Sequence, residues 1–180
     1  MPTTYTKADR ETQALIEKTM EKYHGGHTDA GVTVQVLMAY PPKDEDGEPT
    51  GPALKHRGLV ALAMIRTTKL EERTLGAADL EIKLDADNWE VCSQRERVAL
   101  IDHELTHKPL RVDGNGNIVR DNLDRPKFAT REHDREYGWF DCIAYRHGAA
   151  SAEARQAHEF LDSDTYRQSY LPGFETITAG

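Results

Sequence analysis

Long apolar segments are missing from this chain. The two longest apolar stretches, residues 32–40 and 59–65, are much shorter than the ~20 residues that a helix needs to cross a membrane, so we expect no membrane span. Residues 1–18 lack the apolar core and the small-residue cleavage site of a secretory signal. Both absences predict a protein that stays in the cytoplasm.

Cysteine is also scarce. The two cysteines, Cys92 and Cys142, lie far apart and outside any C-x-x-C pair. This spacing excludes a disulfide scaffold and a four-cysteine zinc ribbon. We expect both side chains to be reduced thiols.

Positive charge is in deficit. Lys and Arg number 23 against 31 Asp and Glu, which gives a formal net charge of −8. Such a surface repels a DNA duplex unless a local basic patch compensates, so nucleic acid is not an expected partner. Because the chain has 180 residues, 38% of them hydrophobic, it can bury one moderate core, and we predict a single domain over residues 1–180.

The chain opens with a helical pattern. Residues 7–24 carry apolar side chains at spacings of three and four, and Thr6 with Asp9 forms a candidate capping box before them. Gly25 and Gly26 follow. Paired glycines favour a left-handed exit from a helix, so we expect a turn there.

Strand patterns follow, and together with the helices they predict an α+β fold built on a small mixed β-sheet. Residues 32–40 are rich in β-branched side chains and predict a strand, whereas residues 41–58 collect prolines, glycines and acids and predict an exposed, mobile acidic loop. Residues 59–67 predict a strand, although their composition also suits a short helix. Residues 79–84 alternate apolar and charged side chains, which we interpret as an edge strand.

The clearest helix lies in the middle of the chain. Ser93 and Glu96 form a capping box, and apolar side chains recur at helical spacing until Pro109. Proline disfavours a helical conformation in the residue before it. We therefore predict a helix over residues 94–108.

This predicted helix carries the motif H-E-x-x-H. His103 and His107 are four positions apart, so their imidazoles project from one helix face toward one metal ion. Glu104 follows His103 by about 100° around the helix, where its carboxylate can reach a bound water as a general base. A shuffled chain of this composition would contain the motif roughly 3% of the time, but its place on a capped amphipathic helix favours a real metal site.

A zinc site with catalytic function needs a third protein ligand. The downstream candidates are His133, His147 and His158, with Glu132 and Glu136 as carboxylate alternatives. We favour His133, because Thr130 can cap a helix over residues 131–147, which Gly148 would end. His133 would then lie in the first turn of that helix. His147 would lie at its C-terminus, where a histidine complements the helix dipole, and we assign it no role in the site.

Two further patterns accompany this region. The buried stripe of the helix over residues 131–147 is expected to consist of Tyr137, Phe140, Ile143 and Ala144. Between the two helices, residues 111–120 predict a β-hairpin around a turn rich in Gly and Asn. The turn imitates the start of a calcium loop, but Ile118 stands where such a loop needs glycine, so calcium binding is not expected.

Several of these motifs together carry a resemblance. They are Trp89, the stretch A-L-I-D-H-E-L-T-H at residues 99–107, the hairpin, R-P-K at residues 125–127, His133 with Asp134, and Y-G-W-F at residues 137–140. In this combination the chain resembles the putative phage metallopeptidase family, which is similar to the small SprT-like zincins. The resemblance covers most of the chain up to about Gly148.

The resemblance implies a zincin-like fold, with an edge strand beside the H-E-x-x-H helix. It implies Zn²⁺ held by His103, His107 and His133, with Glu104 as the catalytic residue, and a phage or prophage protein. Many SprT-like proteases carry a cysteine-rich zinc ribbon, which this sequence lacks. A role on DNA is therefore not implied.

The leading hypothesis is a zinc metallopeptidase, whose protein or peptide substrate pairs with the strand at residues 79–84. Asp102 and Asp134 are candidates for orienting the ligand imidazoles, and Tyr137 is a candidate donor to the transition-state oxyanion. The alternatives are a catalytically silent, zinc-stabilised module that captures a host or phage protein, and a hydrolase of cell-wall amides. For residues 149–180 we predict only a helix over residues 152–161 and an irregular tail.

Overall fold

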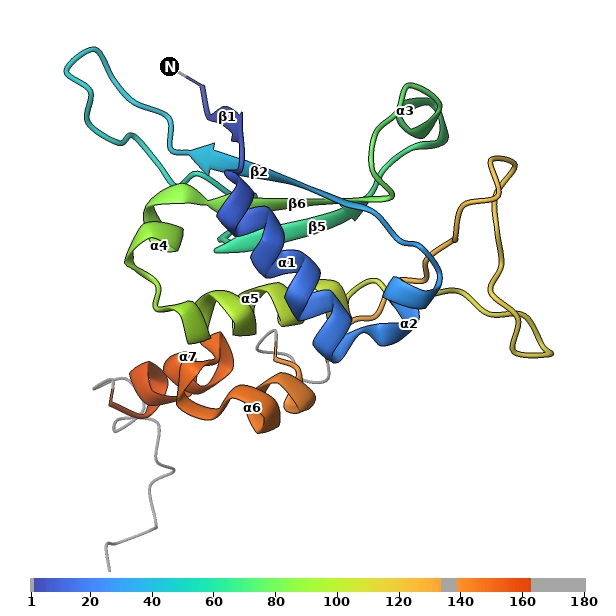
Figure 1. Ribbon diagram of the computed structural model, residues 1–180. Coiled ribbons are helices and arrows are strands. Elements are labelled where there is room, and N and C mark those ends of the chain that lie inside the picture. The colour runs from blue at the N-terminus through green and yellow to red at the C-terminus, as the bar shows by residue number, and fades with distance from the viewer. Residues whose placement is uncertain (1, 134–138, 163–180) are drawn as a thin grey trace, which may run out of the picture.

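The computed structural model describes residues 2–133 and 139–162, and it has a mixed α+β fold, as expected, in which helices pack beneath a small sheet (Figure 1). The strands are β1 (Thr4–Lys7), β2 (Val34–Tyr40), β3 (Lys55–His56), β4 (Leu59–Val60), β5 (Ala63–Thr67) and β6 (Leu80–Asp85). The helices are α1 (Arg10–Tyr23), α2 (Gly25–Asp29), α3 (Leu70–Thr74), α4 (Ala86–Val91), α5 (Gln94–Thr106), α6 (Asp141–His147), the 3₁₀ turn η1 (Gly148–Ala150) and α7 (Ala152–Asp162).

The main sheet has the strand order β1-β2-β6-β5. β2 and β6 are parallel, whereas β1 and β5 run antiparallel to their neighbours, so the sheet is mixed, as predicted. The prediction that residues 79–84 form an edge strand is wrong, because β6 lies between β2 and β5. Alternation of apolar and charged side chains reports which face of a strand is covered, not how many neighbours the strand has. The edge strand of this part of the sheet is β5.

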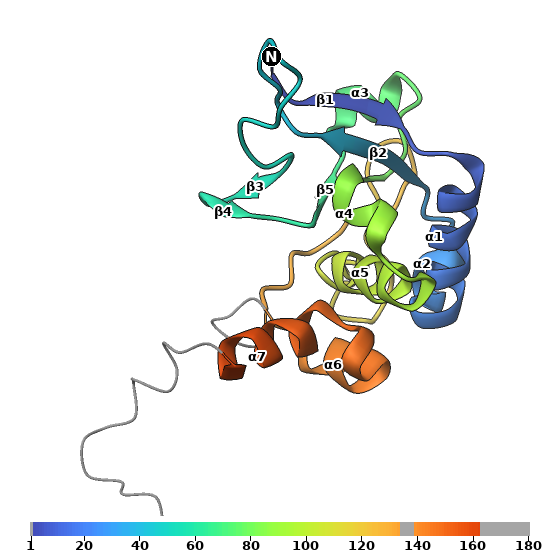
Figure 2. The same cartoon turned by 90° about the vertical axis from the view of Figure 1, so that its left-hand side faces the viewer.

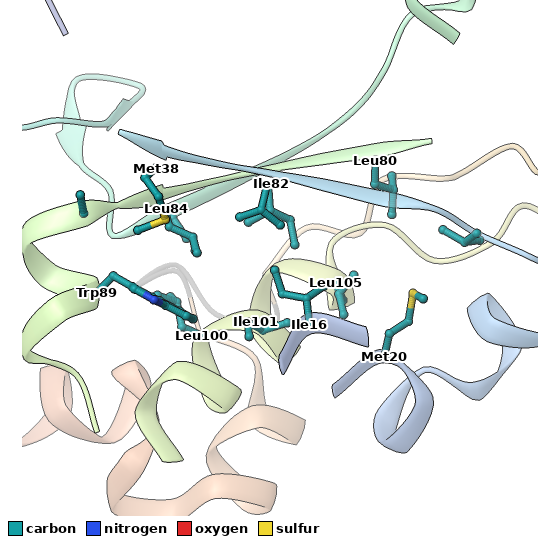
Figure 3. Packing of buried hydrophobic residues seen from close by; sticks show 14 of the residues in the cluster. Ile16, Met20, Met38, Leu80, Ile82, Leu84, Trp89, Leu100, Ile101 and Leu105 are labelled. Atoms are coloured by element: carbon teal, nitrogen blue, oxygen red, sulfur yellow. The ribbon is translucent and has the colours of Figure 1, made fainter. Parts of the chain in front are cut away.

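The core lies between one face of the sheet and the helices. Figure 3 shows Leu80, Ile82 and Leu84 of β6 directed toward α1 and α5. Ile16 of α1 and Ile101 of α5 are fully buried against them. Burying each such side chain contributes roughly 1.5–3 kcal/mol, and this packing fixes α5 beneath the sheet.

The first helix is shorter than predicted. It begins at Arg10 because Asp9 is the N-cap, whose carboxylate accepts a hydrogen bond from the amide of Thr12 at 2.7 Å, and the preceding residues form β1 instead. The predicted turn at the glycines is also wrong, since they begin α2. The buried ring of His27 in α2 hydrogen-bonds to the carbonyl of Lys108 at 2.8 Å. This tertiary contact outweighs the poor helix propensity of glycine.

The segment over residues 41–58 is exposed between residues 43 and 50, as expected, but Ala53 and Leu54 are buried and pack with Ala39. Residues 59–67 form strands rather than the alternative helix, in two short pieces, β4 and β5. β4 pairs with β3 as a small hairpin beside the main sheet (Figure 2). Among the described residues no helix combines the length and the apolar character that crossing a bilayer requires.

Candidate metal centre

The H-E-x-x-H motif lies at the end of α5, close to where the sequence predicts it. Ser93 caps the helix, and its reciprocal hydrogen bonds with Glu96 form the predicted capping box. The helix ends at Thr106, so His103 lies in its last turn and His107 is the C-cap residue. The two imidazoles lie side by side, with ring centroids 5.2 Å apart.

His133 reaches these rings from an extended segment, not from the predicted helix. Residues 131–133 have no helical structure, and α6 begins only after Phe140, its N-cap. The backbone instead runs antiparallel to the chain that leaves α5. Ala129 donates to the carbonyl of Pro109, and Arg131 donates to that of His107, both at 2.9 Å. These bonds satisfy the backbone in extended form, and they bring His133 back to the motif.

The chain between these paired segments forms the predicted hairpin. Val112 and Ile118 pair across it. The carboxylate of Asp113 accepts from the amides of Asn115 and Asn117, at 2.8 and 2.9 Å. These bonds stabilise the turn itself, so its acidic side chain supports the local fold.

The three histidines converge. One ring nitrogen of each lies within 4.8 Å of those of the other two, and the Nε2 atoms of His103 and His133 are 3.2 Å apart. His107 and His133 have ring centroids 4.5 Å apart. Three imidazoles at this separation match the ligand set of a histidine-rich catalytic zinc site.

The Nδ1 atoms of two of the rings lie within hydrogen-bond distance of acceptor oxygens. Nδ1 of His103 is 2.7 Å from Oε1 of Glu153, and Nδ1 of His107 is 2.9 Å from the carbonyl of Arg131. A carbonyl oxygen only accepts, so Nδ1 of His107 carries the proton and the lone pair of Nε2 remains available for a metal. Carboxylate and carbonyl partners of this kind fix the orientation of metal-ligating imidazoles. The donor set therefore fits a divalent cation such as zinc.

The surroundings also set the protonation of the rings. Burial is the main reason that the pKa of His107 is lowered to about 4; the hydrogen bond to the Arg131 carbonyl opposes this shift, and the charges of His103 and His133 add to it. Burial and the positive charge of His103 lower the pKa of His133 as well. Burial is the largest influence on His103 and disfavours its charged form, but the hydrogen bond to Glu153 and the negative charges of Glu104, Glu153 and Asp102 together raise its pKa. His107 and His133 are thus held neutral, as metal ligation requires.

Glu104 lies between α5 and the edge of the sheet. Its side chain is buried, and this burial raises its pKa to about 7, against the attraction of His103 and a hydrogen bond with the backbone of Ile65. A carboxylate in this state can take up and release a proton near neutral pH. Its contact with Ile65 places it beside β5.

A comparison with protein families matches residues 3–162 to the family described as putative phage metallopeptidase. The chain belongs to this family. Comparisons with curated proteins and with solved structures gave no match.

In this phage metallopeptidase family member, Phe140 lies among all three histidine rings. Its ring centroid is 4.9 Å from those of His103 and His133 and 4.7 Å from that of His107, and the residue is fully buried. The sequence predicts its burial, but as part of a helix stripe. In the structure it forms an apolar floor that keeps water from one side of the imidazoles.

The structure changes the role assigned to Asp102 and agrees with the expectation for His147. Asp102 contacts none of the three histidines by a hydrogen bond, and instead binds His24, Arg146 and His147. His147 therefore lies outside the histidine cluster, as expected. Asp134 and Tyr137 lie outside the described residues. His158 is exposed on α7.

Glu153 is the site residue that sequence reasoning missed. It lies on α7, in a segment for which only a helix was predicted, and its exposed fraction is 2%. A glutamate at the second position of a helix is normally explained by the helix dipole. No local pattern links it to a histidine 50 residues away.

We expect Glu153→Gln to weaken metal binding by about 10- to 100-fold, the usual cost of losing the partner of a ligating histidine. The amide is a poorer acceptor for the Nδ1–H group of His103, and it removes the negative charge that makes this imidazole a stronger ligand. Competition with a chromophoric zinc chelator measures the affinity. Glu159→Gln, an exposed position on the same helix, is the matched control. Equal affinities in the two variants would contradict a role for Glu153 in the site.

Proposed function

We propose that this chain is a zinc-dependent metallopeptidase of the zincin type, encoded by a phage or prophage, that hydrolyses peptide bonds of proteins in the host cytoplasm. The family description supports a phage metallopeptidase. The observation that carries the proposal is the convergence of His103, His107 and His133 beside the buried carboxylate of Glu104. This combination supplies both a metal site and an adjacent base.

The reaction needs an electrophile, a nucleophile and a proton carrier. When bound, zinc polarises the substrate carbonyl and lowers the pKa of water to about 7. Glu104 takes the proton from the attacking water and gives it to the leaving amine, which its pKa of about 7 allows. Phe140 excludes water from the rear of the histidines, and Glu153 holds the His103 ring in place.

The edge of the sheet supports binding of an extended substrate. The amide of Thr68 donates to the carbonyl of Asp79 at 3.0 Å. Because hydrogen-bonded and non-hydrogen-bonded pairs alternate along an antiparallel ladder, the even-numbered residues of β5 bond to β6. The odd-numbered residues Ala63, Ile65 and Thr67 direct their backbone groups toward the unpaired side, where the amide of Ile65 is taken by Glu104 and its carbonyl remains for a substrate. An extended peptide can add antiparallel to this edge. The substrate strand is thus β5, in place of residues 79–84.

The test is zinc-dependent cleavage. The zinc-loaded protein is incubated with a peptide library prepared from host-cell proteins and, in parallel, with peptidoglycan fragments, and the products are identified by mass spectrometry. We expect new peptide termini that disappear after chelation and return when zinc is restored. Zinc-dependent release from peptidoglycan alone would contradict the proposal in favour of a cell-wall amidase. The absence of any zinc-dependent product would contradict hydrolysis altogether.

A further inference from the structure

A cavity of about 330 Å³ lies at the end of the edge strand. Thr67 of β5 lines one side of it, and Arg111 and Lys127, from the paired segments that leave and re-enter the site, line the other. Phe128 supplies an apolar wall. The cavity therefore lies between the end of β5 and the segment that follows His107.

The charges around this cavity are unbalanced. Arg73 and Asp121 also line it, but they form a salt bridge of 2.9 Å and neutralise each other. The side chains of Arg111 and Lys127 are exposed, and neither has an ion-pair or hydrogen-bond partner within residues 2–133 and 139–162. A chain with a net charge of −8 thus presents two unpaired cations at one end of its candidate cleft. Unpaired cations beside an apolar wall are suited to a carboxylate on a flexible stem.

The register of β5 relates the cavity to the reacting bond. Ile65 touches Glu104 through its backbone, and Thr67 is two residues farther along the strand, which is about 7 Å at the rise of a β-strand. In a substrate antiparallel to β5, the residue beside Thr67 precedes the residue beside Ile65. The cavity therefore receives a side chain on the amino-terminal side of the scissile bond, about two residues away.

We propose that this cavity is a specificity subsite for an acidic side chain, Asp or Glu, on the amino-terminal side of the cleaved bond, with Arg111 and Lys127 as the residues that select it. This inference rests on the proposed peptidase function and names the substrate class of that site. It makes the enzyme selective for acidic segments of its protein substrates.

The first experiment aligns the sequences cleaved in a peptide library on the scissile bond. For the wild-type enzyme we expect Asp and Glu to be enriched at one position on the amino-terminal side, and kcat/KM to be about tenfold higher for a Glu peptide than for its Gln counterpart, as two partly exposed ion pairs would give. The double variant Arg111→Glu/Lys127→Glu should prefer Lys and Arg at that same position. A loss of folding cannot produce such an inversion. Cleavage without any charge preference would overturn the proposal.

The matched control is Arg10→Glu/Lys18→Glu. Both residues are exposed on α1, neither lines the cavity, and the net charge changes by the same amount. This variant should keep the wild-type preference for acidic peptides. An inversion here too would show that the preference comes from overall charge, and it would overturn the assignment to Arg111 and Lys127.

A binding measurement separates this proposal from the peptidase function. Capped hexapeptides that differ only by Glu, Gln or Lys at one position are titrated against Glu104→Gln protein, and the dissociation constants are read from fluorescence anisotropy. We expect the Glu peptide to bind about tenfold more tightly than the Gln peptide and the Lys peptide to bind most weakly. The Arg111→Glu/Lys127→Glu change should invert this order. If this charge-dependent binding is seen while the wild type cleaves no peptide, the peptidase function fails and the subsite stands. Equal binding of all three peptides would overturn the subsite.

Discussion

Replacing Glu104 by Gln is expected to lower kcat/KM for peptide hydrolysis by about a thousandfold, the usual scale of a lost general base. The amide has nearly the same shape as the carboxylate but cannot accept a proton from water. The proposed metal ligands are the three converging histidines and not Glu104, so the zinc content should remain at the wild-type level. Cleavage of a fluorogenic peptide and elemental analysis of the same samples provide both measurements.

The same variant decides between an enzyme and a silent binding module. Glu90→Gln, at an exposed position of α4, is the matched control and should keep full activity. If Glu104→Gln retains both its metal and the full biological effect of the protein in infected cells, catalysis is not its function. The zinc-stabilised capture of a partner protein would then be the better explanation.

The features that the sequence predicts best are those with local causes. The start of α5 follows from Ser93 and Glu96, because a capping box involves residues three positions apart, whereas its end at Thr106 comes two residues before the predicted one. The pairing of His103 with His107 follows from helix geometry in the same way. Both are confirmed in the structure because no distant contact is needed to produce them.

The features that the sequence predicts poorly depend on distant partners. β6 lies between β2 and β5 in the sheet, and the alternation of side chains along a strand does not specify which strands will be its neighbours. The sequence predicts His133 as a ligand through a helix that the structure does not have over residues 131–133. It reaches the cluster because residues 129 and 131 bond to the chain after α5, and such pairing between segments leaves no periodic signal. The contact between Glu153 and His103 is hidden for the same reason.

Asp102 is the centre of a second buried cluster, which shares no residue with the three converging histidines. Its carboxylate is fully buried and lies 2.8 Å from Nε2 of His24 and of His147, and 2.9 Å from Nη1 of Arg146. His24 follows α1, whereas the other two residues end α6. One carboxylate therefore joins three helices, because α5 carries it.

We expect Asp102→Asn to lower the free energy of unfolding by about 3 kcal/mol, the lower end of the cost of breaking a buried ion pair. The amide cannot accept from all three donors, and the guanidinium of Arg146 loses its counter-charge, although its 37% exposed side chain can turn partly to water. In a domain of this size the melting temperature should fall by about 6–12 °C. Asp29→Asn, on the exposed surface of α2, should change stability by less than about 0.5 kcal/mol.

The pH dependence of this difference tests its electrostatic origin. Burial raises the pKa of Asp102, but the hydrogen bonds from His24 and His147, together with the positive charges of His24 and Arg146, lower it overall. A carboxyl group with a lowered pKa in the folded state stabilises the protein above its ordinary pKa of about 3.9, and this contribution is lost as the pH falls through the folded-state value. Denaturant unfolding of wild type and Asp102→Asn should therefore give stabilities that converge below about pH 4. A difference that is unchanged down to pH 3 would assign the loss to altered packing, because only a charged Asp102 can hold the three helices through these bonds.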